Sequence, residues 1–558
     1  MTRRVAIIGG GSSGLVCIKT CLDEGLEPVC YESSDDIGGL WRFKENPEPD
    51  RASIYHSVII NTSKEMMCFS DFPIPGEFPN FMHNSLIMEY FRMYVDHFKL
   101  TKHIRLNTKV LQVKQRSDFS HSGQWDVEIE NKDSTKEKHI FDAVMICIGH
   151  HCEPNLPLHD FPGIDTFTGK FFHSRDYKTP EEWRNKKAVV VGIGNSGGDL
   201  AVELSRVTKQ LYLSTRRGAW VLNRVGENGI PLDLNFNRVL DFFKRVLPFG
   251  VYCSLGERRL NRRFDHHLYN LKPKHRLFSQ HPTVNDDLPN RILSGTIQVK
   301  PNIRRLQGSS VEFNDGTIVD DVDLVVFATG YNFSYPFLTS KVVSVSQNKT
   351  KLYKYVFPPE LERPTLAIIG LVQPLGAIMP ISEMQARWAT RVFKGCIKLP
   401  SAKAMLNDIK YKEESMASRY VASQRHTIQV DYVSYMDEIA ELVGVQPKIK
   451  RMLFTDPKLA LKLVFGPCTP YQFRLRGPGK WAKARQAILT QWERMAQPMQ
   501  TRPCDEPPCH SWLTWPVVLA SVTAGVAAYM YRNSLCTVLQ DPMAWLDWMK
   551  SFLPAENN

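Results

Sequence analysis

Two glycine-rich segments with identical spacing constrain the fold of this chain more than any other feature. They read Gly9-x-Gly11-x-x-Gly14 and Gly192-x-Gly194-x-x-Gly197. Each follows a short β-branched run, at residues 5–8 and 188–191, and each leads into a helical pattern of apolar residues. A strand, a glycine turn and a helix in this order begin a dinucleotide-binding βαβ unit, in which the helix N-terminus faces the pyrophosphate. The sequence therefore predicts an α/β fold with two Rossmann-like dinucleotide-binding domains.

The residues that follow the second strand of each unit differ in charge. The first unit ends in Glu32, whose carboxylate can accept hydrogen bonds from both hydroxyls of a ribose. The second ends in Ser214-Thr215-Arg216-Arg217, and an arginine pairs with a 2′-phosphate that a carboxylate would repel. We therefore expect NADP(H) at the second site and its usual partner, FAD, at the first. An alternative, in which both arginines are merely solvated, stays open.

The cysteine pattern disfavours a disulfide reductase, which needs two cysteines placed against the flavin. The 12 cysteines are scattered, without a Cys-x-x-Cys pair. Cys17 and Cys21 lie one turn apart on the first helix and Cys30 lies in a strand, so we expect all three in the core. Molecular oxygen is then the leading electron acceptor. The same scatter predicts a reducing, cytosol-facing environment for the main body and no metal site.

The 558 residues are too many for one compact core, so several domains are expected. Pro154, Pro157 and Pro162 mark a domain boundary near residue 153. The predicted segments are 1–153 and 331–445 for a discontinuous FAD-binding domain, 154–216 and 295–330 for an NADP-binding domain, 217–294 for a mainly helical insertion, 446–506 for a C-terminal extension of the main body, 511–531 for a membrane-anchoring helix and 532–558 for a short tail.

The formal net charge of +12 includes basic runs at residues 257–263 and 272–276. Such runs are typical of a solvated face, or of a surface near an anionic lipid or an anionic cofactor. The chain has no nucleic-acid-binding motif, so no nucleic-acid partner is predicted. His266 and His267 are expected to be solvated surface rather than a ligand pair.

Residues 511–531 read SWLTWPVVLASVTAGVAAYMY, about the length of one membrane span and without a charged residue. Trp512, Trp515, Tyr529 and Tyr531 stand at its two ends, where amphipathic rings favour the headgroup region. The segment predicts a C-terminal membrane anchor, and a buried hydrophobic helix is the alternative. Whether the tail spans the bilayer or lies in it stays open.

The segment before the second fingerprint, Phe167-x-Gly169-x-x-x-His173-x-x-x-Tyr177, resembles the identifying motif of the flavin-containing monooxygenases. Further segments are similar to the vertebrate members of that family, including those of the dimethylaniline monooxygenase [N-oxide-forming] type, so the likeness covers essentially the whole chain. They are Gly38-Gly39-Leu40-Trp41, Asn61-Thr62-Ser63-Lys64-Glu65, Phe327-Ala328-Thr329-Gly330-Tyr331 and the hydrophobic tail.

The resemblance implies an enzyme in which NADPH reduces FAD and O₂ then forms a C4a-hydroperoxyflavin. This oxidant oxygenates soft nitrogen or sulfur nucleophiles of small xenobiotic or metabolite substrates. It also implies anchoring in the endoplasmic reticulum membrane, with the catalytic body on the cytosolic side. Oligomeric state and substrate preference are not predicted, since the expected pocket walls lie in residues 217–294.

The resemblance also implies the site residues. Asn61 is the catalytic residue, because its neutral amide would lie beside flavin and nicotinamide. His173 is expected to support the nucleotide domain rather than to act as a base. The residues expected to bind FAD are Gly9, Gly10, Gly11, Ser12, Ser13, Gly14, Glu32, Leu40, Trp41, Asn61, Thr62 and Gln373. Those expected to bind NADP(H) are Ile60, Asn61, Asn195, Ser196, Gly197, Gly198, Thr215 and Arg216.

Three alternatives stay open on the motifs alone. One is Baeyer–Villiger oxidation of ketones on the same fold. Another is an NADPH oxidase that releases hydrogen peroxide, and the third is a non-catalytic membrane flavoprotein.

Overall fold

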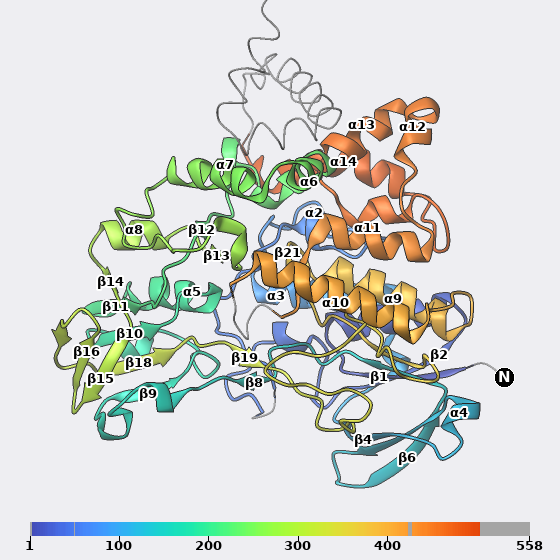
Figure 1. The fold of residues 1–558 in the computed structure, drawn as a ribbon, viewed down its shortest axis with the longest axis horizontal. Helices are drawn as coiled ribbons and strands as arrows, with labels where there is room; N and C mark the ends of the chain where they lie inside the picture. Colours follow the sequence, from blue (N-terminus) through green and yellow to red (C-terminus); the bar gives the residue numbers. More distant parts are fainter. Residues whose placement is uncertain (1–2, 49–50, 422–426, 503–558) are drawn as a thin grey trace, which may run out of the picture.

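A computed structural model describes residues 3–48, 51–421 and 427–502 of the chain. Two five-stranded parallel sheets lie at its centre (Figure 1). The first has the order β20 (Leu366–Ile368), β7 (Ala143–Ile146), β1 (Arg4–Ile8), β2 (Glu27–Tyr31) and β3 (Ile104–Arg105). The second has the order β14 (Ile297–Lys300), β11 (Gln210–Ser214), β10 (Lys187–Val191), β18 (Leu324–Phe327) and β9 (Lys170–His173).

The two sheets repeat one arrangement around the strand that precedes each glycine turn. Strand β1 lies between β2 and β7, with Val5 opposite Pro28 and Ala143. Strand β10 lies between β11 and β18, with Ala188 opposite Leu211 and Leu324. Both strands are almost fully buried, which explains why they read as continuous apolar runs. The α/β part of the predicted fold is confirmed.

Helices and small antiparallel sheets cover the two faces of each parallel sheet. On the first sheet, α1 (Ser12–Asp23), α3 (Asn84–His97), α9 (Met379–Phe393) and α11 (Tyr432–Val443) share one core. The sheet of β4 (Lys109–Gln115), β5 (Trp125–Glu130) and β6 (Lys136–Phe141) covers the other face. On the second sheet, α5 (Asn195–Leu204) and α8 (Leu288–Leu293) cover one face. The sheet of β15 (Ile303–Gln307), β16 (Ser310–Phe313) and β17 (Ile318–Val319) covers the other.

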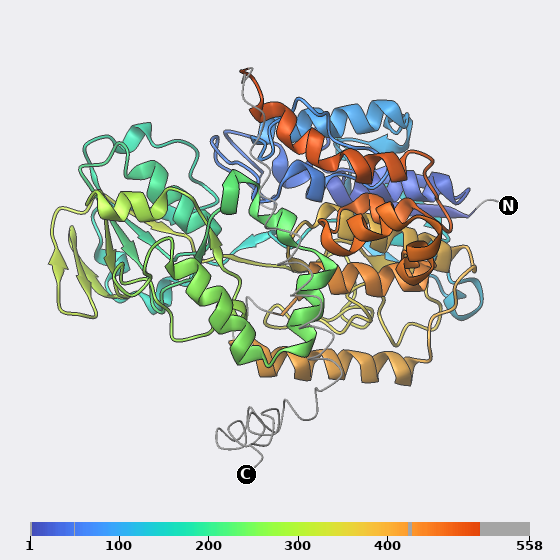
Figure 2. The same cartoon turned by 90° about the horizontal axis from the view of Figure 1, so that it is seen from above.

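The chain between β11 and α8 forms a bridge between the two sheets. It contains β12 (Val221–Leu222), α6 (Arg238–Val246), α7 (Phe249–Asn261) and β13 (Thr283–Val284). Figure 2 shows α6 and α7 running from the second sheet's side of the molecule toward the first. There α6 packs on α11, and Arg238 and Lys244 pair with Asp437 and Asp431.

The C-terminal part of the described chain is fixed to the core of the first sheet. Helices α12 (Ile449–Thr455), α13 (Pro457–Phe465) and α14 (Ala484–Ala496) form this extension. Buried Arg474 pairs with Glu383 at 2.7 Å and with Asp71 at 2.9 Å. Because a buried cation needs such partners to offset desolvation, these pairs hold the extension in one position.

Among residues 3–48, 51–421 and 427–502, no helix is both long and apolar enough to cross a membrane. The predicted anchor at 511–531 and the tail at 532–558 lie outside the described residues. Cys17, Cys21 and Cys30 are fully buried, so their expected place in the core is confirmed.

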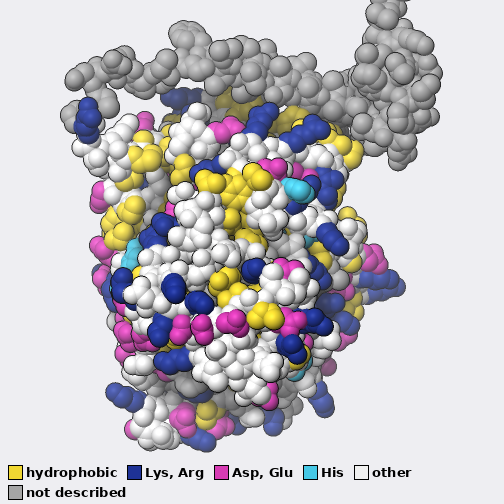
Figure 3. Space-filling view, turned by 90° about the vertical axis from the view of Figure 1, so that its left-hand side faces the viewer, with side chains coloured by type: hydrophobic (Ala, Val, Ile, Leu, Met, Phe, Trp, Pro, Cys, Tyr) yellow, Lys and Arg dark blue, Asp and Glu magenta, His cyan; other side chains and the backbone are white. Residues whose placement is uncertain are grey.

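Positive and negative side chains are mixed on one face of the molecule. On the face shown in Figure 3, Lys and Arg side chains are interspersed with Asp and Glu. In the basic run on α7, Arg259 pairs with Glu227, and Glu257 pairs with Arg276. His267 is exposed as expected, but the expectation is wrong for His266, which is fully buried. A turn after α7 directs one ring inward, where its Nε2 accepts a hydrogen bond from the Val221 amide.

Candidate functional site

The first glycine turn fits only residues without a side chain. Gly9 has a φ of +106°, and a Cβ there would lie 2.7 Å from the Cys147 carbonyl oxygen. A Cβ on Gly14 would lie 1.9 Å from the Gly9 carbonyl oxygen. The turn therefore lets α1 start directly against β1. Gly11 caps the helix, and no acidic residue lies in its first turn, so its free amides can face an anion.

Glu32 closes this cradle from the end of β2. Its Oε2 accepts a 2.6 Å hydrogen bond from the Gly10 amide, and its Oε1 accepts one from Ser34 N and one from Arg51. The turn at Leu40 and Trp41 lies alongside, because the Gly38 amide donates to the Gly10 carbonyl at 3.0 Å. The structure thus brings together the predicted FAD residues from Gly9 to Gly14, Glu32, Leu40 and Trp41.

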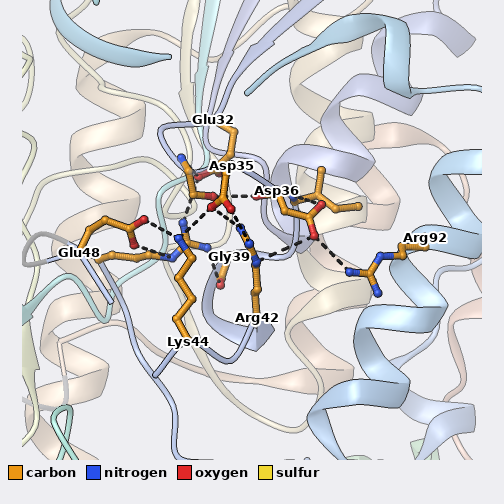
Figure 4. A network of polar contacts seen from close by, with 11 residues as sticks. Glu32, Asp35, Asp36, Gly39, Arg42, Lys44, Glu48 and Arg92 are labelled. Carbon is orange, nitrogen blue, oxygen red and sulfur yellow. Dashed lines mark hydrogen bonds and ion pairs between the residues drawn. The ribbon is translucent and has the colours of Figure 1, made fainter. Parts of the chain in front are cut away.

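A network of ion pairs around Glu32 was missed by sequence reasoning (Figure 4). Arg42 donates two hydrogen bonds to Asp35, at 2.8 and 2.9 Å, and Lys44 donates to both Asp35 and Glu48. These hydrogen bonds lower the pKa of the Asp35 carboxyl. Arg92 reaches Asp36 from α3 at 3.1 Å. The network fixes the segment after Glu32, and no local motif in the sequence marks it.

The second glycine turn repeats the first. Gly192 has a φ of +105°, and a Cβ there would lie 2.6 Å from the Ala328 carbonyl oxygen. A Cβ on Gly197 would lie 2.0 Å from the Gly192 carbonyl oxygen. The Gly9 amide donates to the Tyr31 carbonyl at 2.9 Å, and the Gly192 amide donates to the Ser214 carbonyl at the same distance. In both cases the acceptor is the last residue of the next strand. Both turns therefore present the same kind of dinucleotide cradle.

The insertion covers the start of α5. The Val284 amide donates to Asn195 Oδ1 at 2.8 Å, and Thr283 lies against Gly198. Asn195 thus holds the insertion in place, a contact the sequence did not predict for it. At the end of β11, Thr215 Oγ1 accepts a hydrogen bond from the Gly218 amide at 3.1 Å, and Arg216 is exposed.

Asn61 follows a loop that contacts Glu32 through Arg51 and α5 through Tyr55. Its Oδ1 is buried and has no hydrogen-bond partner among the described residues, as expected of an atom placed for a ligand. Ile60 is fixed by a 3.0 Å hydrogen bond from its amide to the Met82 carbonyl, and Thr62 is half-buried. The Ser63 amide donates at 2.7 Å to Asp233, which comes from the insertion. Sequence reasoning missed Asp233, because one acid between two leucines carries no pattern.

The loop that leads to Asn61 is tied to the second sheet's helix α5. The Tyr55 hydroxyl donates to Asp199 at 2.5 Å, and the Ser57 hydroxyl donates to Glu203 at 2.6 Å. Burial raises the pKa of the Asp199 carboxyl. These two bonds fix the position of the Asn61 loop relative to the second cradle.

The segment from Phe167 to Tyr177 supports the same loop. Arg175 donates from Nε to the Arg51 carbonyl at 3.0 Å. Buried His173 contacts the Gly330 carbonyl through Nε2 at 2.9 Å and accepts from the Arg175 amide through Nδ1. With both ring nitrogens bonded to the backbone, His173 has the geometry of a supporting residue, as expected.

Gln373, the remaining predicted residue, lies in β21 (Gln373–Leu375). Its Oε1 accepts a 2.6 Å hydrogen bond from Gln429 of β22 (Gln429–Asp431), so a structural contact engages this oxygen. Nearby Gly370 lies against Ser13 on α1, since a Cβ on Gly370 would be 2.5 Å from the Ser13 hydroxyl. Gln373 therefore belongs to the segment that borders the first cradle.

The residues present fit two dinucleotides. Both cradles combine a glycine turn with a helix N-terminus, and neither α1 nor α5 has an acidic residue in its first turn. The first cradle adds the carboxylate of Glu32, which suits an unphosphorylated ribose, and the second adds Arg216. The buried Oδ1 of Asn61, without a partner in residues 3–48, 51–421 and 427–502, follows the loop that contacts both cradles.

The charge of Asp233 gives a testable prediction. Burial raises the pKa of Asp233 to about 6, whereas an aspartate in an unfolded chain ionises near ~4. Between these pH values the folded protein keeps a proton that the unfolded chain has lost. The free energy of unfolding therefore falls as the pH rises through this window.

The variant Asp233→Asn keeps an acceptor for the Ser63 amide but cannot ionise. We expect the difference in melting temperature between the variant and wild type to grow as the pH rises from about 4 to about 6. The corresponding gain in the free energy of unfolding, relative to wild type, is roughly 2–3 kcal/mol. Differential scanning fluorimetry of both proteins across that range measures the change. A constant difference in melting temperature would contradict the prediction.

Comparisons with known proteins agree with this geometry. Residues 2–531 match the family model described as flavin-binding monooxygenase-like. Flavin-containing monooxygenase 5 of Rattus norvegicus is 59% identical over 501 residues, covering 90% of this chain and 94% of the relative. Dimethylaniline monooxygenase [N-oxide-forming] 2 of Cavia porcellus is 50% identical over 530 residues, covering 95% and 99%.

Among solved structures, the S-allyl-L-cysteine S-oxygenase of Allium sativum superposes with a TM-score of 0.61. The match covers 89% of this chain and 99% of that structure at 24% identity, so it supports the fold. The family match confirms the predicted enzyme class and the predicted cofactors, FAD and NADPH. The chain belongs to the flavin-binding monooxygenase-like family and is a flavoprotein monooxygenase.

Proposed function

We propose that this enzyme transfers one oxygen atom from O₂ to soft nitrogen or sulfur nucleophiles of small molecules. NADPH, a proton, O₂ and the substrate give NADP⁺, water and the oxygenated substrate. Two similar proteins support this substrate class by their names. One relative is named an N-oxide-forming dimethylaniline monooxygenase, and one protein of similar fold is named an S-oxygenase of S-allyl-L-cysteine.

The observation that carries the proposal is the buried Oδ1 of Asn61, which has no hydrogen-bond partner among the described residues and follows a loop that contacts both cradles. The cradle at Gly9 carries Glu32, and we assign FAD to it and to the domain of residues 1–153 and 331–445. The cradle at Gly192 carries Arg216, and we assign NADPH to it and to the domain of residues 154–216 and 295–330. The Asn61 loop is bonded to α5 of the second domain through Tyr55 and Ser57.

The chain's own residues hold, orient and shield the two cofactors. Residues Gly9 to Gly14, Glu32, Leu40, Trp41 and Thr62 would hold FAD, with Gln373 at the border of that site. Ile60, residues Asn195 to Gly198, Thr215 and Arg216 would hold NADPH. When bound, the flavin accepts a hydride from NADPH and passes the electrons to oxygen.

Asn61 has the chemistry that a site for activated oxygen needs. Its amide offers a donor and an acceptor and does not titrate, so it can orient a polar group without protonating it. The covering insertion, fixed at Ser63 by Asp233, keeps water from this loop. Exclusion of water prevents loss of the oxidant as hydrogen peroxide.

Product analysis tests the function. With NADPH and O₂, the FAD-loaded enzyme should convert a thioether to its sulfoxide and a tertiary amine to its N-oxide. It should consume one NADPH for each molecule of product formed. Ester formed from a ketone, without any sulfoxide, would instead identify a Baeyer–Villiger enzyme. Hydrogen peroxide equal to the NADPH consumed, whatever amine is present, would identify an oxidase.

The variant Asn61→Ala tests the assigned residue. We expect it to keep its FAD, seen in the visible spectrum, while the yield of sulfoxide per NADPH falls by about tenfold or more and hydrogen peroxide rises. The exposed Asn290 on α8 provides a matched control, and Asn290→Ala should behave as wild type. A normal yield from Asn61→Ala would remove Asn61 from the reaction.

The C-terminal tail is proposed to anchor the enzyme in the endoplasmic reticulum membrane, with the catalytic body in the cytosol. Its sequence at residues 511–531 has the length of one span. Helices α6, α7, α12, α13 and α14 lie together at the top of Figure 1. Exposed apolar side chains gather on these helices, as on a surface that faces lipid. They include Leu240, Phe242, Val251, Leu255, Leu453 and Phe454.

Alkaline carbonate extraction of membranes tests this anchoring. The full chain should stay in the membrane pellet, whereas a chain that ends at Glu506 should move largely to the supernatant. The truncated chain must still bind FAD to be a valid comparison. Extraction of the full chain as readily as the truncated one would overturn the anchor.

A further inference from the structure

A cavity of about 900 Å³ lies beyond the end of β11, next to the second cradle. Five of its lining residues are cationic, and they come from three separate parts of the chain. They are Arg216, Arg217, Lys272, Lys274 and Lys300. Its single lining carboxylate, Asp315, is engaged through Oδ1 by the amide and the hydroxyl of Thr317.

Most of these cations have no anionic partner in the described part of the chain. Arg216, Arg217, Lys272 and Lys274 are exposed and form no ion pair there. Lys300 donates to the Thr317 hydroxyl at 3.1 Å and lies over the ring of Phe313. Like charges repel when they are held around one cavity, so this arrangement raises the free energy of the protein without a ligand. A bound anion would offset that repulsion.

The backbone of the insertion is fixed beside Arg216. Gly218 has a φ of +71°, and a Cβ there would lie 2.2 Å from the Leu271 carbonyl oxygen. The Ala219 amide donates to that same carbonyl at 2.9 Å. Buried His266 accepts through its carbonyl from the amides of Leu271 and Lys272. The turn after β11 and the segment that carries the two lysines are thus joined.

From this cavity we infer that Lys272 and Lys274 of the insertion complete the binding site for the 2′-phosphate of NADPH that Arg216 begins. The inference rests on the proposed assignment of NADPH to the cradle at Gly192. A phosphate group carries up to two negative charges, so several cations can bind it at once. Arg216 follows the β-strand that, in such folds, ends beside the nucleotide ribose. Selectivity for NADPH over NADH is then shared between the Rossmann unit and the insertion.

Calorimetric titration of the FAD-loaded full chain with 2′,5′-ADP and with 5′-AMP isolates the 2′-phosphate contacts. We expect Lys272→Ala and Lys274→Ala each to lower the affinity for 2′,5′-ADP on the order of tenfold and to leave the affinity for 5′-AMP unchanged. The wild-type affinity for 2′,5′-ADP should fall more steeply with added salt than that of either variant.

Lys209→Ala is the matched control, because Lys209 is an exposed lysine at the opposite end of β11. Its affinity for 2′,5′-ADP should equal that of wild type. Unchanged affinity in both Lys272→Ala and Lys274→Ala, or an equal loss in Lys209→Ala, would overturn the inference.

Anaerobic reduction of the wild-type flavin by NADPH and by NADH separates this inference from the proposed function. Equal reduction by both nucleotides would contradict the assignment of NADPH itself. A wild-type preference for NADPH, together with normal 2′,5′-ADP binding in both lysine variants, would leave the assignment intact and remove only the role of the insertion.

Discussion

Close approach between a glycine turn and the carbonyl of a neighbouring strand is the constraint on which the rest of the structure depends. At Gly9 the neighbour is Cys147, and at Gly192 it is Ala328. A side chain at either position would push the turn away from that strand, and a side chain at Gly14 or Gly197 would push the helix away from the turn. Because the helix can start against the strand, its amides could bind a pyrophosphate, and the end of the next strand could bind the ribose. The positions of Glu32 and Arg216 follow from the same geometry.

The features that could be predicted from the sequence were those that depend on residues close together in the chain. The glycine spacing and apolar runs predicted both parallel sheets, and the charge after each second strand predicted which nucleotide each cradle suits. Family membership supports that pair of cofactors. Residue assignments such as Leu40 and Trp41 came from the family resemblance, and the structure brings these residues to the first cradle.

What could not be predicted depends on residues that are far apart in the chain. Asp233 reaches Ser63 across 170 positions, and Asn195 binds Val284 across 89. Neither contact has a periodic pattern, because each is set by how the insertion folds back over the two cradles. His266 was misjudged for a related reason. Two adjacent histidines suggest a polar surface, but a turn that follows a helix can bury one ring and expose the next.

The insertion begins at the turn after β11 and contacts several distant parts of the chain, among them the Asn61 loop, the start of α5 and helix α11. A segment with so many attachments cannot vary freely. Changes that reshape it for a new substrate would also shift the residues to which we assign the nucleotide and the loop that carries Asn61. Substrate range, the amount of product formed per NADPH and the release of hydrogen peroxide are therefore expected to change together as related enzymes diverge.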